Sequence, residues 1–328
     1  MSIGCKAEHS RVCKKVCASI LEAVGNTPIV ELKRMRDPSA ARILVKVEFL
    51  NVGGSIKTRT ALAMIEAAEK EGVLKKGSII VEPSSGNQGI GLALVGAIKN
   101  YRVIIVMPDS VSEERRKLME HYGAEVVLVP DNDDIGECIQ GCLAAAMKMA
   151  EGDPRIFIPQ QFNNPNNPKV QRERTAVEIL EQVNTPIDGF CSGIGTGGTI
   201  SGVGEVLKKQ FPHVRIMAVE PENAAILAGG GITTHLQMGI GDGLIPENLN
   251  TDIIDGVYVI SDDEALQTAR DLARFEGLLC GISSGSNVAG ALRLAKELGP
   301  GKTVLTFLPD TGERYFSTQL FEKPANQD

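Results

Sequence analysis

The sequence predicts an α/β protein of two domains, each built on a mostly parallel β-sheet flanked by helices, with the active site in the cleft between the domains. Its 328 residues exceed the size of roughly 250 to 300 residues at which a single hydrophobic core stops growing. Short apolar runs alternate with amphipathic stretches, which is the pattern of parallel sheets covered by helices. The 35 glycines and 16 prolines suit a fold that is rich in loops.

Seven short apolar runs are the candidate strands. They cover residues 78–82, 103–107, 125–129, 155–158, 189–192, 215–219 and 304–308. The polar, proline-bearing segment 160–169 does not match the pattern of a helix or a strand. We therefore expect it to be irregular and to carry the chain from one domain to the other.

The net charge and the lack of long apolar runs indicate what kind of molecule the protein binds. The formal net charge of -7 gives no general attraction to nucleic acid or to anionic membranes. No apolar run reaches the roughly 18 residues of a membrane span, and charged residues stud the stretch before Gly25 where a signal peptide would be apolar. We expect a cytoplasmic protein that binds small molecules, and neither nucleic acid nor a membrane.

Neither cysteines nor histidines indicate a metal site. The seven cysteines are odd in number and lack the paired CxxC spacing of a zinc site, which also argues against a disulfide framework. The four histidines are scattered along the chain. The sequence therefore predicts no metal.

Lys57 follows a glycine pair at the start of a predicted helix. The segment Asn51-Val-Gly-Gly-Ser-Ile-Lys57 precedes an alanine-rich helical stretch, residues 60–71. The positive end of a helix is a poor place for a cation unless function demands it. A lysine whose ammonium form is destabilised suits Schiff-base chemistry. Taken alone, an ordinary helix lysine and a reactive one both remain open.

Two further loops each join an apolar run to a helical pattern. Residues 82–89 offer hydroxyl, amide and backbone N–H groups to a carboxylate, although a turn with a helix cap has the same composition. Residues 193–199 (Gly-Ile-Gly-Thr-Gly-Gly-Thr) form a candidate phosphate loop. This loop also matches the dinucleotide pattern G-x-G-x-x-G, with Glu220 near the expected distance. A nicotinamide dehydrogenase leaves Lys57 without a role, whereas a cofactor with an aldehyde and one phosphate uses all three features.

In this order, the motifs resemble those of the fold-type II pyridoxal 5′-phosphate (PLP) enzymes, in the branch of the cysteine synthases and cystathionine β-synthases. The resemblance runs from Ile20 to about Thr318. Each motif alone is weak, but their order is specific. The motifs are Gly25-Asn-Thr-Pro28, Gly53-Gly-Ser-Ile-Lys57, Ser85-Gly-Asn87, Gln161-Phe162 with Asn164-Pro165 and Asn167-Pro168, Gly195-Thr-Gly-Gly-Thr199, Gly281-Ile-Ser-Ser-Gly285 and Pro309-Asp-Thr-Gly-Glu-Arg-Tyr315.

The resemblance implies PLP as the cofactor and gives roles to site residues. Lys57 would hold PLP as a Schiff base and later move the Cα proton, Asn87 would bond the ring hydroxyl oxygen, and Ser283 would face the pyridine nitrogen. The other implied site residues are Gly195, Thr196, Gly197, Gly198 and Thr199 for the phosphate, and Ser84, Ser85, Gln88 and Gln161 for the substrate carboxylate.

The resemblance also implies how the chain is organised. Residues 1–19 would be an N-terminal extension, and residues 46–160 a smaller mobile domain. Residues 20–45 together with 161–328 would form the larger domain, which binds the PLP phosphate. The expected assembly is a homodimer.

A serine at position 283, facing the pyridine nitrogen, affects which reactions the cofactor favours. A neutral hydroxyl cannot stabilise a pyridinium as a carboxylate does, so the ring is a weaker electron sink. A long-lived carbanion is then disfavoured, and prompt loss of a β-substituent through an aminoacrylate is favoured. The implied activity is β-elimination or β-replacement on L-cysteine or an O-activated L-serine, with sulfide or another small thiol as partner.

Three residues depart from the usual cysteine synthase pattern. Thr58 replaces an aspartate, Gln88 replaces a threonine, and Asp242 interrupts the usual Gly-Ile-Gly-Ala-Gly-Phe. Asp242 beside the substrate would repel hydrosulfide, whereas water needs a general base before it can attack. We therefore expect L-cysteine and water to give L-serine and hydrogen sulfide, with Asp242 activating the water.

Several alternatives stay open. Asp242 could point to solvent or pair with a nearby cation, which would remove the reason for preferring hydration. The activity would then be that of an O-acetylserine sulfhydrylase. A cystathionine β-synthase-like condensation and a non-catalytic regulatory scaffold are further alternatives.

Overall fold

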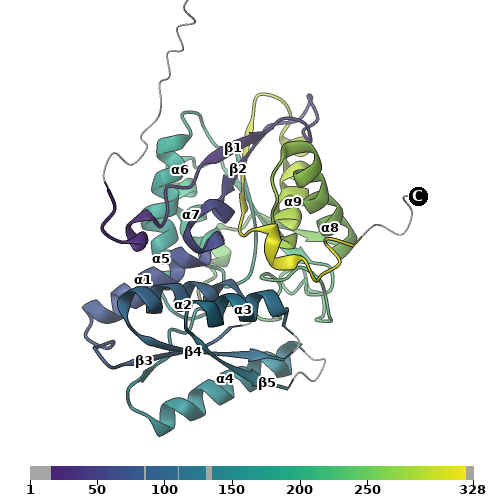
Figure 1. The fold of residues 1–328 in the computed structure, drawn as a ribbon. Coiled ribbons are helices and arrows are strands. Elements are labelled where there is room, and N and C mark those ends of the chain that lie inside the picture. Colours follow the sequence, from purple (N-terminus) through teal and green to yellow (C-terminus); the bar gives the residue numbers. More distant parts are fainter. Residues whose placement is uncertain (1–15, 85, 110, 131–134, 323–328) are drawn as a thin grey trace, which may run out of the picture.

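The computed structural model describes residues 16–84, 86–109, 111–130 and 135–322, which contain two separate β-sheets (Figure 1). The larger sheet has the strand order β1 (Ile29–Leu32), β2 (Arg42–Val47), β10 (Thr303–Leu308), β7 (Gly189–Gly193), β8 (Arg215–Pro221) and β9 (Gly256–Ile260). The smaller sheet has the order β5 (Glu125–Val129), β4 (Arg102–Pro108), β3 (Ile79–Pro83) and β6 (Ile156–Phe157). Only the pair β1 and β2 is antiparallel among these described strands. The predicted fold class is confirmed.

Helices cover both faces of the smaller sheet. α1 (Lys57–Lys70), α2 (Asn87–Lys99) and α3 (Glu113–His121) lie on one face, and α4 (Ile135–Gly152) lies on the other (Figure 1). Side chains alternate along β3, so Ile80 packs in the core beneath α1 and α2 while Val81 packs in the core beneath α4. Burial on both faces is characteristic of parallel strands and explains their apolar sequences.

The larger sheet is also covered on both faces. α8 (Asp262–Asp271) and α9 (Ile282–Leu298) share one core with β2 residues such as Val45. α6 (Ala176–Gln182) and α7 (Gly198–Gln210) share the opposite core with Leu44, the preceding residue of β2. Within the described residues, no helix is long and apolar enough to cross a membrane.

The seven predicted strands are all present, with ends shifted by at most two residues. β1, β2 and β9 were not predicted. Lys46 interrupts the apolar pattern of β2, although the structure buries this lysine completely. The prediction of an irregular segment 160–169 is wrong in part, because helix α5 (Asn166–Val170) begins within it. Pro168 is tolerated as the third helical residue, since an N–H at that position has no acceptor within the helix.

A buried ionic network ties α1 to the larger sheet. Arg59, in the first turn of α1, is 2% exposed and pairs with Glu48, just after β2, and with Glu178 in α6. Its nitrogens lie 2.6–2.9 Å from the oxygens of these two carboxylates. Lys46 lies 2.8 Å from Glu178 and donates a hydrogen bond to the backbone oxygen of Thr27. Two cations and two carboxylates therefore balance one another inside the protein.

The segment after β10 holds the start of α1 as well. The N–H of Ile56 donates to the carbonyl oxygen of Pro309 at 2.9 Å, and Ser55 and Asp310 form an antiparallel bridge. Lys57 is the first residue of α1. The larger sheet therefore sets the position of Lys57, although α1 covers the smaller sheet. The exact domain boundaries stay a prediction.

Arg59→Met should destabilise the protein, because it leaves Glu48 and Glu178 without their shared cation. Removing one partner of a buried ion pair costs about 3–5 kcal/mol. Urea denaturation followed by circular dichroism would measure the loss. The matched control is Arg174→Met, whose side chain is 58% exposed and lies 3.9 Å from Glu66. This control should cost less than about 1 kcal/mol, and equal losses for the two variants would contradict a role for the network.

Candidate active site

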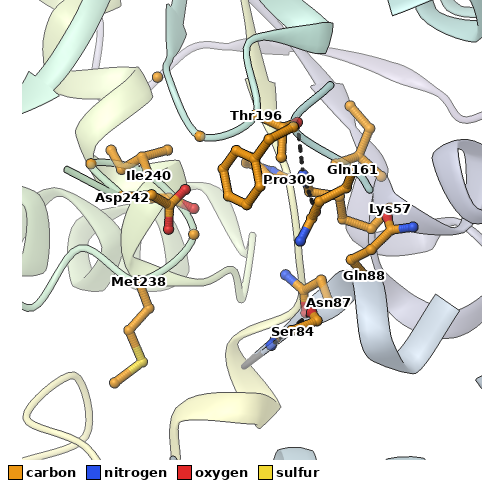
Figure 2. A pocket seen from close by; sticks show the side chains of 18 of the residues that line it. Lys57, Ser84, Asn87, Gln88, Gln161, Thr196, Met238, Ile240, Asp242 and Pro309 are labelled. Carbon is orange, nitrogen blue, oxygen red and sulfur yellow. Dashed lines mark hydrogen bonds between the residues drawn. The ribbon is translucent and has the colours of Figure 1, made fainter. Parts of the chain in front are cut away.

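A cavity of about 510 Å³ lies at the carboxyl ends of strands from both sheets (Figure 2). It is lined by the start of α1, by the loops after β3 and β7, and by the segment 234–242. Ser85 was predicted as a site residue but lies outside the described residues. The other predicted site residues all line this cavity: Lys57, Ser84, Asn87, Gln88, Gln161, Gly195, Thr196, Gly197, Gly198, Thr199, Asp242 and Ser283.

The Lys57 amine lies beside two polar side chains, one from the loop after β7 and one from the segment between β6 and α5. Its Nζ is 3.2 Å from Thr196 Oγ1 and 3.5 Å from Gln161 Oε1. Burial lowers the pKa of this amine to about 8, although the carboxylates of Asp242 and Glu82 act in the opposite direction. A fraction of the amine is therefore neutral near neutral pH, as a nucleophilic lysine requires.

The loop from Gly195 to Thr199 fits a phosphate group. Among the described residues, none accepts a hydrogen bond from the backbone N–H groups of residues 195–198. These donors lie at the N-terminus of α7, where an anion is favoured. Side chains cannot be added here, because a Cβ on Gly195 would lie 2.4 Å from the oxygen of Gly239 and one on Gly198 would lie 2.0 Å from Asn167 Oδ1.

The loop after β3 presents a hydroxyl group, from Ser84, and a side-chain amide, from Gln88. Ser84 Oγ accepts hydrogen bonds from the backbone N–H groups of Gly86 and Gly89, at 3.4 and 3.1 Å, so it also stabilises the turn. Gln88 is 1% exposed, and neither end of its amide has a partner among the described residues. A buried amide without a partner costs free energy unless a ligand supplies one. Gln88 is therefore the clearest sign of a polar ligand in this loop.

Asn87 is held by two residues to which the sequence analysis gave no role. Its Nδ2 donates to Asp310 Oδ2 at 2.7 Å, and its Oδ1 accepts a hydrogen bond from Arg314. Tyr315 donates its hydroxyl to the same Asp310 oxygen at 2.7 Å. The motif from Pro309 to Tyr315 was recognised in the sequence, but its contact with Asn87 was not. These contacts fix the orientation of the Asn87 amide and leave one of its N–H groups for a ligand.

Gln161 is positioned by Glu82, another residue that sequence reasoning missed. The backbone N–H groups of Gln160 and Gln161 donate to the two oxygens of Glu82, at 2.9 and 3.0 Å. Burial raises the pKa of Glu82 to about 7, although these two hydrogen bonds and the charge of Lys57 oppose the shift. The carboxylate at the end of β3 thus holds the loop that brings Gln161 to Lys57.

Asp242 lines the cavity on the side opposite Lys57. In Figure 2, Asp242, Ile240 and Met238 lie together on one side, and Lys57, Asn87 and Ser84 lie on the other. Burial raises the pKa of Asp242, while the charge of Lys57 acts to lower it. No hydrogen bond from the described residues contributes to this shift. Asp242 therefore offers a carboxylate to the cavity.

The loop that carries Asp242 is fixed through Gly241. The N–H of Gly241 donates to the carbonyl oxygen of Ile194 at 2.9 Å. Its own carbonyl oxygen lies 2.9 Å from Nε2 of His235, while Nδ1 of that histidine accepts from the N–H of Gln237 at 3.1 Å. Both ring nitrogens of His235 are therefore engaged by the backbone. Of the side chains of His235 and Asp242, the Asp242 carboxylate is the one that can accept a proton from a ligand.

Ser283 enters the cavity from α9, as the second residue of that helix, and it is 3% exposed. Asn287, one turn further on, accepts a hydrogen bond from the N–H of Gly193 at 2.6 Å and donates one to the oxygen of Phe307 at 3.0 Å. These bonds fix the start of α9 against β7 and β10. Within the described residues, no cluster of histidine, cysteine or acidic side chains could hold a metal ion.

The chain is similar to known proteins over most of its length. A family model described as "pyridoxal-phosphate dependent enzyme" matches residues 20–310. A cysteine synthase from Staphylococcus aureus is 48% identical, over 94% of this chain and 98% of its own. The solved structure of an O-ureido-L-serine synthase is 43% identical with a TM-score of 0.90, covering 96% of this chain and 98% of that one. A hydrogen sulfide-producing enzyme from Fusobacterium nucleatum is 40% identical with a TM-score of 0.87, covering 92% and 100%.

Gly195→Ala should weaken the binding of PLP, because the new Cβ would displace Gly239 and distort the phosphate loop. We expect a loss of affinity of roughly 10-fold or more, equivalent to one hydrogen bond to a charged group. Fluorescence titration of the apoprotein with PLP would measure it. Gly231→Ala is the control, since a Cβ there meets no atom within 4 Å. An unchanged dissociation constant for Gly195→Ala would remove the phosphate assignment.

Proposed function

The chain belongs to the family of pyridoxal-phosphate dependent enzymes, and from this premise we propose the reaction it catalyses. It is an enzyme of the cysteine synthase kind and acts on small amino acids. We propose that it takes L-cysteine, releases hydrogen sulfide and adds water to give L-serine. The observation that carries this proposal is the Asp242 carboxylate, which lines the cavity and on whose pKa no hydrogen bond from the described residues acts.

The cavity has groups that suit both the phosphate and the aldehyde of PLP. The N–H groups of the Gly195 loop would hold the phosphate, and the Lys57 amine would bind the aldehyde carbon. Asn87 would reach the ring hydroxyl and Ser283 the ring nitrogen. When bound, PLP draws electrons from the substrate Cα, so that its proton and the β-substituent can leave. This fit argues for PLP and against the nicotinamide cofactor that the same glycine pattern allowed.

Lys57 would move the proton at Cα. Its pKa of about 8 keeps part of the amine neutral at physiological pH, so its Nζ can accept a proton. Thr196 and Gln161, at 3.2 and 3.5 Å, would orient the amine once it is released from the cofactor.

The substrate carboxylate would dock on the loop after β3. Gln88 brings a buried amide without a partner among the described residues, and Ser84 keeps its hydroxyl hydrogen available while its oxygen accepts from the backbone. Ser85 and Gln161 complete the proposed set. We also propose that the smaller domain, residues 46–160, closes over the larger one when the carboxylate docks, because exclusion of bulk water leaves the attack to the water molecule held at Asp242.

Asp242 would act on the second substrate. Water must lose a proton as it attacks Cβ, and a buried carboxylate with a raised pKa is a stronger base than an exposed one. The charge of Lys57 favours its ionised form. Hydrosulfide is already an anion, so the same carboxylate would repel it.

The alternative is O-acetylserine sulfhydrylation, the reaction suggested by the similarity to the S. aureus cysteine synthase. The neighbouring structure of a hydrogen sulfide-producing enzyme favours consumption of cysteine. A cystathionine β-synthase-like condensation would need a larger acceptor, and a regulatory scaffold would not need the Lys57 amine. Assays with L-cysteine alone and with O-acetylserine plus sulfide would separate these activities.

Borohydride reduction of the holoenzyme should fix the cofactor to Lys57. Peptide mapping by mass spectrometry would locate it. Lys46 is an internal control, because it is also buried and has a lowered pKa but is engaged by Glu178. Cofactor found on Lys46, or on any lysine other than Lys57, would end the assignment.

Asp242→Asn should slow serine formation by about 10²- to 10⁴-fold, the usual loss when a general base is removed. Sulfide release in the first turnover should persist, because it depends on Lys57, and an added thiol should restore turnover. Chromatography of serine and colorimetry of sulfide would measure the two steps. Asp263→Asn, at an exposed position of α8, controls for the change of charge. Absence of serine in the wild-type reaction would favour the sulfhydrylase instead.

A further inference from the structure

Arg115 is a buried cation of the cavity to which the proposed reaction gives no role. It belongs to α3, is 5% exposed and lines the same cavity as Lys57. Its Nη1 lies 3.0 Å from the sulfur of Met238, and its guanidinium lies 5.0 Å from the ring centre of Tyr315. Its Nε is buried without a hydrogen-bond partner among the described residues. None of the ion pairs between described residues includes Arg115.

Two acids of this region accept hydrogen bonds from other residues: Glu114, the neighbour of Arg115 in the chain, and Asp310, which is bonded to Tyr315. Glu114 accepts hydrogen bonds from the backbone and hydroxyl of Ser317, at 3.0 and 2.9 Å. Asp310 accepts from Asn87 and Tyr315 at Oδ2, and its Oδ1 has no hydrogen-bond partner among the described residues. A thioether is only a weak acceptor, so it cannot replace the hydration that a guanidinium loses on burial. Buried cations are normally paired, and Arg115 therefore lacks the anion that would balance it.

Two other parts of the cavity offer hydrogen-bond donors to an anion, and the proposed reaction supplies an anion for each of them. The phosphate loop at Gly195 suits the cofactor phosphate, and the loop with Gln88 suits the substrate α-carboxylate. Arg115 Nη1 lies 3.0 Å from the sulfur of Met238, and Met238 lies on the same side of the cavity as Asp242 in Figure 2. Arg115 is therefore left for an anion other than the cofactor phosphate and the substrate α-carboxylate. The surrounding lining is apolar, with Pro108, Val111 and Met238.

We propose that Arg115 forms a third anion subsite, which takes an anionic group on the β-substituent. This group is either the distal carboxylate of an incoming thiol or the charged leaving group of an activated serine. The inference rests on the proposed exchange at Cβ, but it does not depend on Asp242 or on water as the nucleophile. A guanidinium with spare N–H donors in apolar surroundings distinguishes an anion strongly from a neutral group of the same size.

Paired acceptors test the first source of the anion. The holoenzyme is given O-acetyl-L-serine with either 3-mercaptopropionate or 2-mercaptoethanol, and the ratio of their kcat/KM values is measured. The wild type should prefer the carboxylate. Arg115→Gln should lower the ratio by about 10- to 100-fold, as expected for a lost hydrogen bond between charged groups. Arg115→Lys should retain part of it.

Paired donors test the second source. O-Phospho-L-serine and O-acetyl-L-serine are compared with sulfide as the acceptor, and the same ratio is taken. If Arg115→Gln lowers the kcat/KM ratio only for the pair of donors, the subsite binds the leaving group. If it lowers the ratio only for the pair of thiols, the subsite binds the acceptor. Lys117→Gln is the matched control, because it removes one charge from the same helix at a position where the side chain is 65% exposed.

Two results would overturn the subsite. One is a wild type that shows no preference for the anionic member of either pair. The other is a folded Arg115→Gln, checked by circular dichroism and thermal unfolding, in which both members of each pair decline equally, as a purely structural role requires. If Arg115→Gln does not fold, the comparison of Arg115→Lys with the wild type decides. Turnover of none of the donors would instead refute the proposed exchange at Cβ, and the subsite with it.

Discussion

The ion pairs of Arg59 form the constraint on which the position of the active-site amine depends. Arg59 is two residues after Lys57 in the first turn of α1, and its partners Glu48 and Glu178 belong to the part of the chain around the larger sheet. Burial raises the pKa of Glu178, but the hydrogen bonds and charges of Arg59 and Lys46 outweigh it and lower the pKa to about 2. Glu178 is therefore ionised throughout the physiological range. Because hydrogen bonds are directional, it fixes the rotation of α1 as well as its position, which packing of its alanine-rich face alone would leave less defined.

The electrostatics of the cavity follow from burial acting in opposite directions on amines and carboxyl groups. Burial lowers the pKa of Lys57 to about 8 and raises that of Glu82 to about 7, and it also raises the pKa of Asp242. The charge of Lys57 opposes the shifts of the two carboxyl groups, and their charges oppose the shift of Lys57. The pKa values of Lys57 and Glu82 are thus about 8 and about 7. A base with a pKa near the working pH suits general acid and base chemistry.

The sequence predicted the features that local pattern encodes. Buried parallel strands such as β4 are continuous apolar runs, and the phosphate loop is visible because close approach of Gly239 requires glycine at position 195. Contacts between distant segments could not be predicted in the same way. Asp310 meets Asn87 across 223 residues, and Glu82 meets Gln161 across 79. Nothing near these acids in the sequence indicates the partner. The buried Lys46 hid strand β2 for the same reason, since the carboxylate that makes its burial tolerable lies in α6.

The Asp242 loop shows how the nucleophile could change while the cofactor site stays the same. Gly239, Gly241 and Gly243 have φ angles of +94°, +71° and +76°, so glycines carry the left-handed conformations and the intervening residues do not. The backbone of Gly241 is bonded to Ile194 and His235, and neither bond involves the side chain at position 242. That side chain can therefore be replaced without moving the loop or the adjoining phosphate loop. Selection can act on the charge at position 242, and on the choice between water and an anionic nucleophile, independently of the groups that bind the phosphate and the aldehyde.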